Sequence, residues 1–381
     1  MIELTFKREE LLKALDYCSS SIEKKHAMII LTHILFCFKG KECTLNATNL
    51  ETTVVARINL ISPVSEGKIA VPAVYIHDIC RVSRGEVMIF RYDEEKNVLD
   101  ITAEKSKYTV PCSDPSDFPV IPETKKEFKN VKINKLILFY KKVQFSMSEN
   151  YLNKAYSGAL ITKVKEEDGT ESIEMVTTDI HRLSVLTLKN LNIDLEEINS
   201  GIVVPGKNFA NITKIFADSE DAEIAIDDEK MFIKNDKVTF ISRLIKNEFP
   251  KYRSIIGTYS EVNARECAVI NRKELIEAIK RVTILNSDEK IWASTYFFNG
   301  NILKMTANSN SGGNSTDEII MEKGFSTERK VSVNAKYFLD VIGVVDSDNV
   351  NIIVGESSKA MVIKEETDDF FYIHMTMPLR I

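Results

Sequence analysis

Near the middle of the chain lies the stretch Thr177-Thr178-Asp179-Ile180-His181-Arg182-Leu183-Ser184. A related stretch, Ala47-Thr48-Asn49-Leu50-Glu51, lies about 130 residues upstream, and a third, Thr306-Ala307-Asn308-Ser309, lies about 130 residues downstream. That separation is the length of a domain rather than of a helical hairpin. The sequence therefore predicts one structural unit repeated three times.

Three further landmarks recur in the same order around each of these stretches. Each repeat opens with a segment whose apolar residues fall at i, i+3, i+4 and i+7, at 8–18, 134–145 and 272–283, which is typical of an amphipathic helix. A shorter amphipathic segment follows a strand-like valine, at 71–82, 204–216 and 333–345. Each repeat closes on an apolar residue before proline, in Phe118-Pro119, Phe249-Pro250 and Met377-Pro378.

Between these helices the sequence is typical of short strands. Segments such as 29–38, 54–60 and 87–92 are rich in β-branched and aromatic residues, and turn formers such as Lys39-Gly40 separate them. Two helices and about seven or eight strands per repeat predict an α+β fold with antiparallel sheets on one side and helices packed on the other. We expect domains at 1–124, 125–256 and 257–381, and we expect the loop 308–317 to be the most flexible segment.

Composition excludes several classes of protein. The 381 residues are 44% hydrophobic and 28% charged, as in ordinary globular proteins. The six cysteines include no CxxC pair and the five histidines no paired ligand spacing, so we expect no metal and no cofactor. The N-terminus lacks the pattern of a signal peptide, and no apolar run is long enough to cross a bilayer. The expectation is a soluble, cytoplasmic protein without a membrane partner.

The charge distribution leaves two interpretations open. A net charge of −6 argues against a nucleic-acid-binding protein. Yet the six helical segments carry more Lys and Arg than Asp and Glu, so an acidic protein could present a positive helical surface. A solvated helix face would produce the same pattern.

A hydrolase is the alternative function. Asp179 and His181 would share one face of a strand, and Ser184 follows closely. However, residues so close in sequence seldom form a triad, and the chain has no Gly-x-Ser-x-Gly elbow. A structural role for Asp179 in a turn is the favoured interpretation.

Three motifs together resemble one protein family over the full length of the chain. They are Thr178-Asp179-x-His181-Arg182-Leu183, Phe249-Pro250-x-Tyr252-Arg253 and the terminal Met377-Pro378-Leu379-Arg380-Ile381. The chain is identified by them as similar to the bacterial DNA polymerase III β subunit, the sliding clamp. The resemblance implies three repeated DNA-clamp domains in a head-to-tail homodimeric ring, with helices lining the lumen and sheets outside. It implies a non-catalytic processivity factor that encircles double-stranded DNA without reading its sequence.

The resemblance also implies partners and site residues. The partners are the replicative DNA polymerase alpha subunit, the clamp loader delta subunit, and other polymerases and repair proteins with clamp-binding motifs. The implied partner-peptide site comprises Tyr156, Thr178, His181, Arg182, Leu183, Pro250, Ile255, Asn334, Tyr337, Met377, Pro378, Leu379 and Arg380. The implied DNA-contacting residues are Lys13, Lys25, Arg81, Lys141, Asn150, Lys154, Lys207, Lys214 and Arg281. The implied dimer interface contains Tyr108, Ile284 and Leu285. The chain departs from the family pattern at Ile180, where glycine is common, at Tyr156 and at Gly206.

Overall fold

The computed structural model describes residues 1–23, 25–149, 154–165, 169–189, 195–257, 265–355 and 360–380. The chain divides into two compact units. The first unit contains Met1–Asn134 and Lys207–Leu244, and the second contains Lys135–Gly206 and Ile245–Ile381. The division separates the two halves of the middle repeat, so each unit combines one complete outer repeat with half of the middle one.

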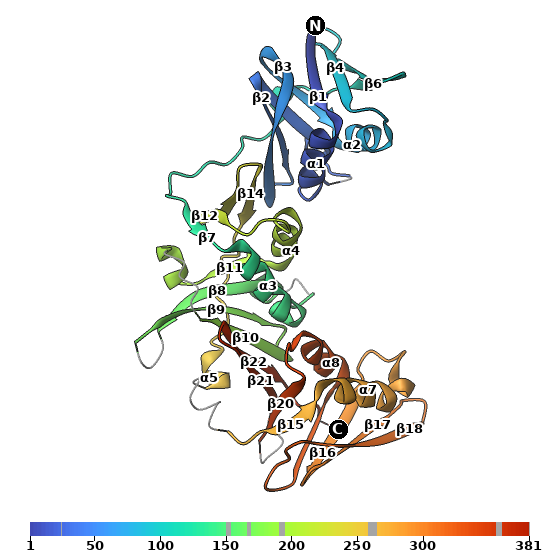
Figure 1. The fold of residues 1–381 in the computed structure, drawn as a ribbon, viewed down its shortest axis with the longest axis vertical. Helices are drawn as coiled ribbons and strands as arrows, with labels where there is room; N and C mark the ends of the chain where they lie inside the picture. The colour runs from blue at the N-terminus through green and yellow to red at the C-terminus, as the bar shows by residue number, and fades with distance from the viewer. Residues whose placement is uncertain are drawn as a thin grey trace. The chain divides into compact units, whose positions relative to one another are not determined.

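Two antiparallel sheets build the first unit (Figure 1). The four-stranded sheet has the order β1 (Ile2–Lys7), β4 (Val87–Asp93), β5 (Val98–Ala103) and β6 (Ser106–Pro111). The six-stranded sheet has the order β2 (His33–Thr48), β3 (Thr52–Pro72), β14 (Val238–Arg243), β13 (Lys230–Lys234), β12 (Ala222–Ile226) and β7 (Lys129–Val131). The β3–β14 pairing joins the first repeat to the end of the second within one sheet.

The second unit repeats this plan with a longer sheet. Its eight strands have the order β11 (Ile202–Pro205), β8 (Gly158–Lys165), β9 (Glu171–Thr178), β10 (Arg182–Leu188), β22 (Phe370–Thr376), β21 (Met361–Glu366), β20 (Asn349–Val354) and β15 (Ala268–Asn271). A four-stranded sheet contains β18 (Asn314–Ile320), β17 (Ile302–Asn308), β16 (Ala293–Asn299) and β19 (Arg329–Asn334). Here β10 pairs with β22 and joins the second repeat to the third.

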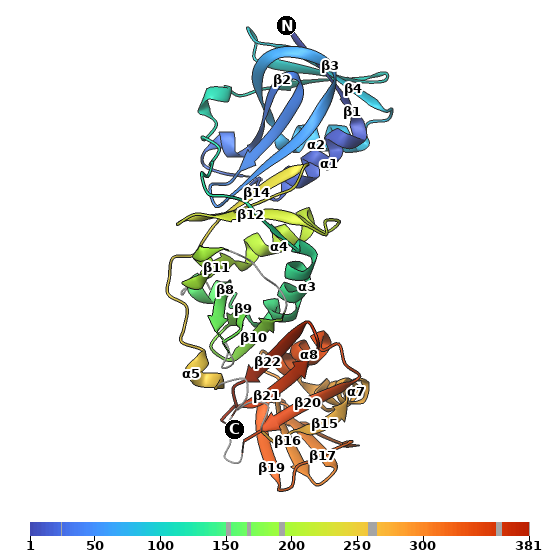
Figure 2. The same ribbon diagram turned by 60° about the vertical axis from the view of Figure 1, so that its left-hand side comes forward.

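The helices confirm the predicted repeat. Each repeat has two longer helices, and each of these helices begins directly after a strand or one residue beyond it. They are α1 (Arg8–Ser19), α2 (Ala73–Val82), α3 (Ile133–Val143), α4 (Gly206–Ile215), α7 (Arg272–Val282) and α8 (Ala335–Val344). In the first unit α1 packs against α2 and against β3, and in the second α7 packs against α8 (Figure 2). The α+β prediction, with helices on one side of antiparallel sheets, is therefore confirmed.

Spacing of apolar residues explains which face of each helix is buried. In α1 the buried residues are Leu11, Ala14, Leu15 and Cys18, at the i, i+3, i+4, i+7 positions that form one stripe of a helix. In α7 they are Leu275, Ala278, Ile279 and Val282, with the same spacing. The opposite faces carry the charged residues, so the helices expose a polar surface.

Three of the predicted strand boundaries were wrong. Lys39-Gly40 does not end a strand, because β2 continues through it with shifts of register on both sides of Gly40. Ile29–Thr32 forms a 3-10 helix instead of the start of a strand. Residues 314–317, predicted to be loop, belong to β18. For Gly40 and for residues 314–317, pairing with a neighbouring strand decides the structure. Local composition does not show which strand that neighbour will be.

The first repeat consequently holds fewer strands than predicted. Because β2 and β3 are continuous, the described residues of 1–124 contain the strands β1 to β6 rather than seven or eight. No helix in the described part of the chain has the length and apolar character needed to cross a membrane.

Candidate functional site

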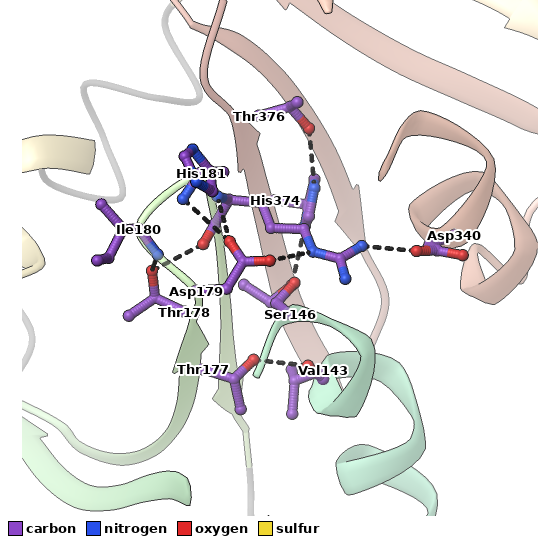
Figure 3. Close-up of polar contacts among 12 residues, drawn as sticks. Val143, Ser146, Thr177, Thr178, Asp179, Ile180, His181, Asp340, His374 and Thr376 are labelled. Atoms are coloured by element: carbon purple, nitrogen blue, oxygen red, sulfur yellow. Dashed lines mark hydrogen bonds and ion pairs between the residues drawn. The ribbon is translucent and has the colours of Figure 1, made fainter. Parts of the chain in front are cut away.

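The 178–182 segment is a hydrogen-bonded turn between β9 and β10 (Figure 3). The Asp179 Oδ1 atom accepts hydrogen bonds from the backbone N–H groups of His181 at 3.0 Å and Arg182 at 2.9 Å. Thr178 Oγ1 donates to the carbonyl of Arg182 at 2.7 Å and accepts from the N–H of Ile180 at 3.1 Å. The structural role predicted for Asp179 is confirmed. The expectation that Asp179 and His181 share a strand face was wrong, because side-chain bonds to the backbone stabilise a turn here.

The first repeat forms the same turn with the same bonds. Thr48 Oγ1 donates to the carbonyl of Thr52 at 2.9 Å and accepts from the N–H of Leu50 at 3.1 Å. Asn49 Oδ1 accepts from the N–H of Thr52 at 2.8 Å. The sequence similarity that suggested the repeat therefore reflects one turn geometry. Between β17 and β18 of the third repeat, Gly312 adopts a positive φ of 91°.

The turn requires a left-handed residue at its third position. Ile180 has a φ of 80° and Leu50 a φ of 71°. Glycine adopts this conformation freely, whereas a β-branched side chain is strained there, by about 1–2 kcal/mol. Ile180 is 65% exposed, so burial does little to offset the strain. The observation supplies a physical reason why glycine would be common at this position.

Arg182 links this turn to α8. Its Nε donates to Asp179 Oδ2 at 2.9 Å and its Nη1 to Asp340 Oδ2 at 2.6 Å. The guanidinium lies 4.2 Å from the ring centroid of Tyr337 and 5.3 Å from that of Phe145. The Arg182 side chain is only 10% exposed. Its charge is thus neutralised within the protein, and the residue holds Tyr337 in place.

The end of the chain packs beside the same turn. The N–H of Met377 donates to the carbonyl of His181 at 2.8 Å, and the N–H of Leu379 donates to the carbonyl of Ser332 at 2.7 Å. These bonds hold the backbone on two sides, so residues 377–379 are not a frayed tail. The Met377 side chain is 46% exposed and His181 is exposed as well, which leaves both available to a partner.

All the predicted partner-site residues lie in the second unit. Backbone hydrogen bonds join His181 to Met377 and Leu379 to β19, and a cation–π contact joins Arg182 to Tyr337. Leu183 is buried in one apolar cluster with Tyr252 and Ile256, which brings it to the segment that carries Pro250 and Ile255. Asn334 is buried and caps α8 by accepting from the N–H of Lys336 at 3.2 Å. Tyr156 is half-buried in a 3-10 helix, Lys154–Ser157.

Two contributors to this site were missed in the sequence analysis, namely Phe145 and Asp340. Asp340 follows Tyr337 by three residues on α8, a spacing that places both on one face of the helix. That spacing was the only local signal for it. Phe145 had no local signal in the sequence, because it contacts Arg182 from a segment that is distant along the chain.

The structure gives no support to a hydrolase. Ser184 is fully buried and bonds to Ser146 Oγ and His374 Nδ1, each at 2.8 Å. Burial, and then the nearby charge of Arg182, lower the pKa of His374 to about 3, so the imidazole is neutral at pH 7. The exposed His181 belongs to the turn, whereas Ser184 is buried in the core. Among the described residues, no group of His, Cys, Asp and Glu side chains is arranged to hold a metal ion.

The predicted DNA-contacting residues are all exposed where the structure describes them; Asn150 lies outside the described residues. Most lie on the long helices: Lys13 on α1, Arg81 on α2, Lys141 on α3, Lys207 and Lys214 on α4, and Arg281 on α7. Lys25 and Lys154 are exposed outside them. Lys13, Lys207 and Lys214 line one open hollow of about 530 Å³ in the first unit. The Lys13 ammonium there is 3.9 Å from the Asp218 carboxylate, and both groups are largely exposed.

The predicted dimer residues lie on an edge strand of the first unit and in a short helix of the second. Tyr108 is half-buried on β6, the edge strand of the first unit's four-stranded sheet. Ile284 and Leu285, in the short 3-10 helix directly after α7, are 67% and 48% exposed. Adjacent exposed apolar side chains such as Ile284 and Leu285, and an edge strand such as β6, are features that another chain can cover.

Comparison with known proteins divides the chain into the same three parts. Models of the N-terminal, central and C-terminal domains of the DNA polymerase III beta subunit match residues 2–122, 130–251 and 262–380. The beta sliding clamps of Pseudomonas putida and Vibrio cholerae are 27% and 26% identical to the chain, over the full length of both proteins. Sliding-clamp structures from Pseudomonas aeruginosa and Caulobacter crescentus superpose with TM-scores of 0.88 and 0.90 at 24% and 23% identity, covering 99% or more of each chain.

Three repeats of paired helices against antiparallel sheets define the DNA-clamp class of fold. The three matched domain models cover nearly the whole chain in order, and the chain belongs to the DNA polymerase III beta subunit family, the bacterial sliding clamps. This family consists of non-catalytic processivity factors. Membership agrees with a buried Ser184 and a structural Asp179.

Proposed function

We propose that this chain is the sliding clamp of a bacterial replicative DNA polymerase. Two copies close head to tail around duplex DNA and tether the polymerase to its template. The domains would be 1–124, 125–256 and 257–381, and the protein would act in the cytoplasm, where the bacterial chromosome is copied.

The observation that carries this proposal is the way in which the repeats join. The strand after the turn of one repeat pairs with the last strand of the next: β3 with β14, and β10 with β22. The third repeat offers β18 in the same role, and the first repeat offers β6 as its last strand. Both are edge strands of their own sheets in the described part of the chain. A second copy would supply β6 to β18 and β18 to β6, which closes the assembly with two identical interfaces.

Side chains at these edges support the same pairing. Tyr108 lies two residues before the buried Val110 on β6, so both side chains point to the core side of the sheet. An aromatic side chain on that side of a free edge needs a cover. Ile284 and Leu285, which follow α7 and are exposed in the single chain, would provide an apolar cover from the partner copy.

DNA would be held by charge and by topology, without base recognition. The exposed Lys and Arg side chains of the helices attract phosphates, and salt weakens that attraction. Several of them are already close to carboxylates, such as Arg81 to Asp78 at 2.9 Å and Arg281 to Asp317 at 2.8 Å. Partial neutralisation of this kind favours a weak grip that permits sliding.

A retention experiment tests the clamp function. Protein loaded by its ATP-driven clamp loader onto a nicked circular duplex should stay bound for minutes at moderate salt. It should leave promptly when the circle is linearised, because nothing but the closed ring holds it. Blocking both ends of the linear DNA should restore retention. Equal retention on circular and open linear DNA, measured by gel filtration of the complexes, would contradict the proposal.

We further propose that partners bind the second unit through short linear motifs bearing leucine and phenylalanine. Met377 and Ile255 supply exposed apolar surface, and His181 with the ordered backbone of 377–379 supplies polar groups. A few polar groups around apolar anchors are the usual means of orienting a peptide. The partners would include the polymerase alpha subunit and the clamp loader delta subunit.

Deleting residues 377–381 should abolish binding of such a peptide, because the chain end is part of the surface. Fluorescence anisotropy with a labelled peptide measures this, and the dimer mass from light scattering should not change. Met377→Ala keeps the backbone bonds to His181 and Ser332, so it should weaken binding without abolishing it. Unchanged affinity in the deletion variant would place the site elsewhere.

A further inference from the structure

A buried carboxylate lies beneath the segment that carries Pro250 and Ile255. Glu174 is on β9, on the face that also carries Val176, and its side chain is only 4% exposed. That face is covered by an apolar cluster containing Val176, Leu183 and Val185. The cross-strand neighbour Thr187 donates one hydrogen bond to Glu174 Oε1, at 3.2 Å. An ionised carboxylate in such surroundings requires further partners.

Those partners come from one short stretch of chain. The hydroxyl of Tyr252 donates to Glu174 Oε2, and Arg253 Nη2 donates to Oε1 at 2.5 Å. Burial, and then the charge of Glu174, raise the pKa of Tyr252 above its ordinary range, so the hydroxyl keeps its proton and acts as a donor. Glu174, Tyr252 and Arg253 form what we call the Glu174 cluster.

The segment held by this cluster has little stability of its own. Its helix α5 (Arg253–Ile256) is a single turn, ended by Gly257 at a φ of 80°. One turn is too short to persist without tertiary contacts. Within it Ile256 is buried in the apolar cluster, whereas Ile255 is 56% exposed. Because neighbouring residues of a helix point about 100° apart, the orientation of this turn decides which isoleucine faces solvent.

We propose that Glu174 is a positioning residue for partner binding: through Tyr252 and Arg253 it holds α5 in the orientation that presents Pro250 and Ile255 to a partner peptide. This inference rests on the proposed partner site in the second unit. Glu174 itself is buried and touches no partner. It lowers the cost of binding because the segment is ordered before the peptide arrives.

The test compares Glu174→Gln with Glu171→Gln. Glu171 lies on the same strand, is 60% exposed and pairs with Lys163 instead of the 249–256 segment, so it is a matched control. Binding of a labelled synthetic peptide with a Leu-Phe pair should weaken roughly tenfold in Glu174→Gln, mainly through a faster off-rate, and should be unchanged in Glu171→Gln. Hydrogen exchange of residues 249–257 should be faster in Glu174→Gln only.

A second set of variants separates positioning from general stability. Arg253→Gln and Tyr252→Phe each remove a hydrogen bond to Glu174 and should weaken peptide binding in the same direction. In the double variant Glu174→Gln with Arg253→Gln, two neutral amides can bond to each other, so it should bind better than Glu174→Gln alone. If Glu174→Gln does not fold, these single variants at Arg253 and Tyr252 decide the question.

The outcomes separate a failure of the positioning role of Glu174 from a failure of the proposed partner site. If the unaltered protein does not bind the peptide, the proposed partner site is wrong and the inference falls with it. If the unaltered protein binds and the cluster variants bind equally well, the partner site stands and the positioning role of Glu174 is overturned. Weaker binding with faster exchange at 249–257 supports the role.

Discussion

A variant carrying Ile284→Lys and Leu285→Lys should be a monomer. In the proposed ring these side chains pack against the β6 edge and Tyr108 of the other copy, and a lysine there would lose its hydration without gaining a partner. Burying an unpaired charge costs several kcal/mol, and the ring contains the interface twice. Sedimentation velocity at micromolar concentration should show the mass of one chain, about 43.2 kDa.

The control for this variant is Ile302→Lys. Ile302 is 51% exposed on β17, an inner strand of the four-stranded sheet that ends in β18, and is not one of the proposed interface residues. It should leave the dimer intact. The monomeric variant should still bind the labelled peptide, because the partner site lies within one chain, but it should no longer be retained on nicked circular DNA. A double variant that stays dimeric would show that these residues are not the interface.

Lys142→Met should lower the free energy of unfolding of the second unit by about 3–5 kcal/mol. The Lys142 ammonium lies 2.7 Å from the carbonyl oxygen of Val344, 2.9 Å from Asp346 Oδ2 and 3.1 Å from Glu365 Oε2. The side chains of Lys142 and Glu365 are each 4% exposed. Removing the lysine leaves the Glu365 carboxylate buried without its counter-charge, at the point where α3 of the second repeat meets the third repeat.

Two comparisons make this prediction specific. Lys141→Met changes the exposed neighbour on the same helix and should alter stability by less than about 0.5 kcal/mol. Adding Glu365→Gln to Lys142→Met removes the orphaned charge and should recover a large part of the loss. Urea denaturation followed by far-UV circular dichroism measures all three variants. A loss no greater than that of Lys141→Met would mean that the ion pair contributes little.

Much of the architecture could be predicted from the sequence because it depends on local periodicity. The apolar stripes at 8–18, 134–145 and 272–283 each became a helix within two residues of the expected bounds. The similarity of the stretches around Thr48 and Thr178 corresponds to one turn with the same side-chain bonds to the backbone. Such features depend on residues a few positions apart, so the sequence records them directly.

The sites depended on contacts that local sequence does not record. The resemblance implies Arg182 in the partner-peptide site, and only the structure shows that Asp340 and Tyr337, more than 150 residues away, enclose it. Ser184 beside Asp179 and His181 suggested a triad, yet its bonds go to Ser146 and His374 in the core.

By itself the sequence determined the threefold repeat, the helices, the α+β class and the family of this protein. Only the tertiary structure decided that Lys142 pairs with Glu365 across 223 residues and that Glu174 reaches Tyr252 across 78. It also decided that β2 runs unbroken through Gly40 and that β6 and β18 are left as edges. The physical reason is that helix periodicity and turn bonds are short-range properties of the chain, whereas strand pairing and the burial of charge depend on which distant segments the fold brings together.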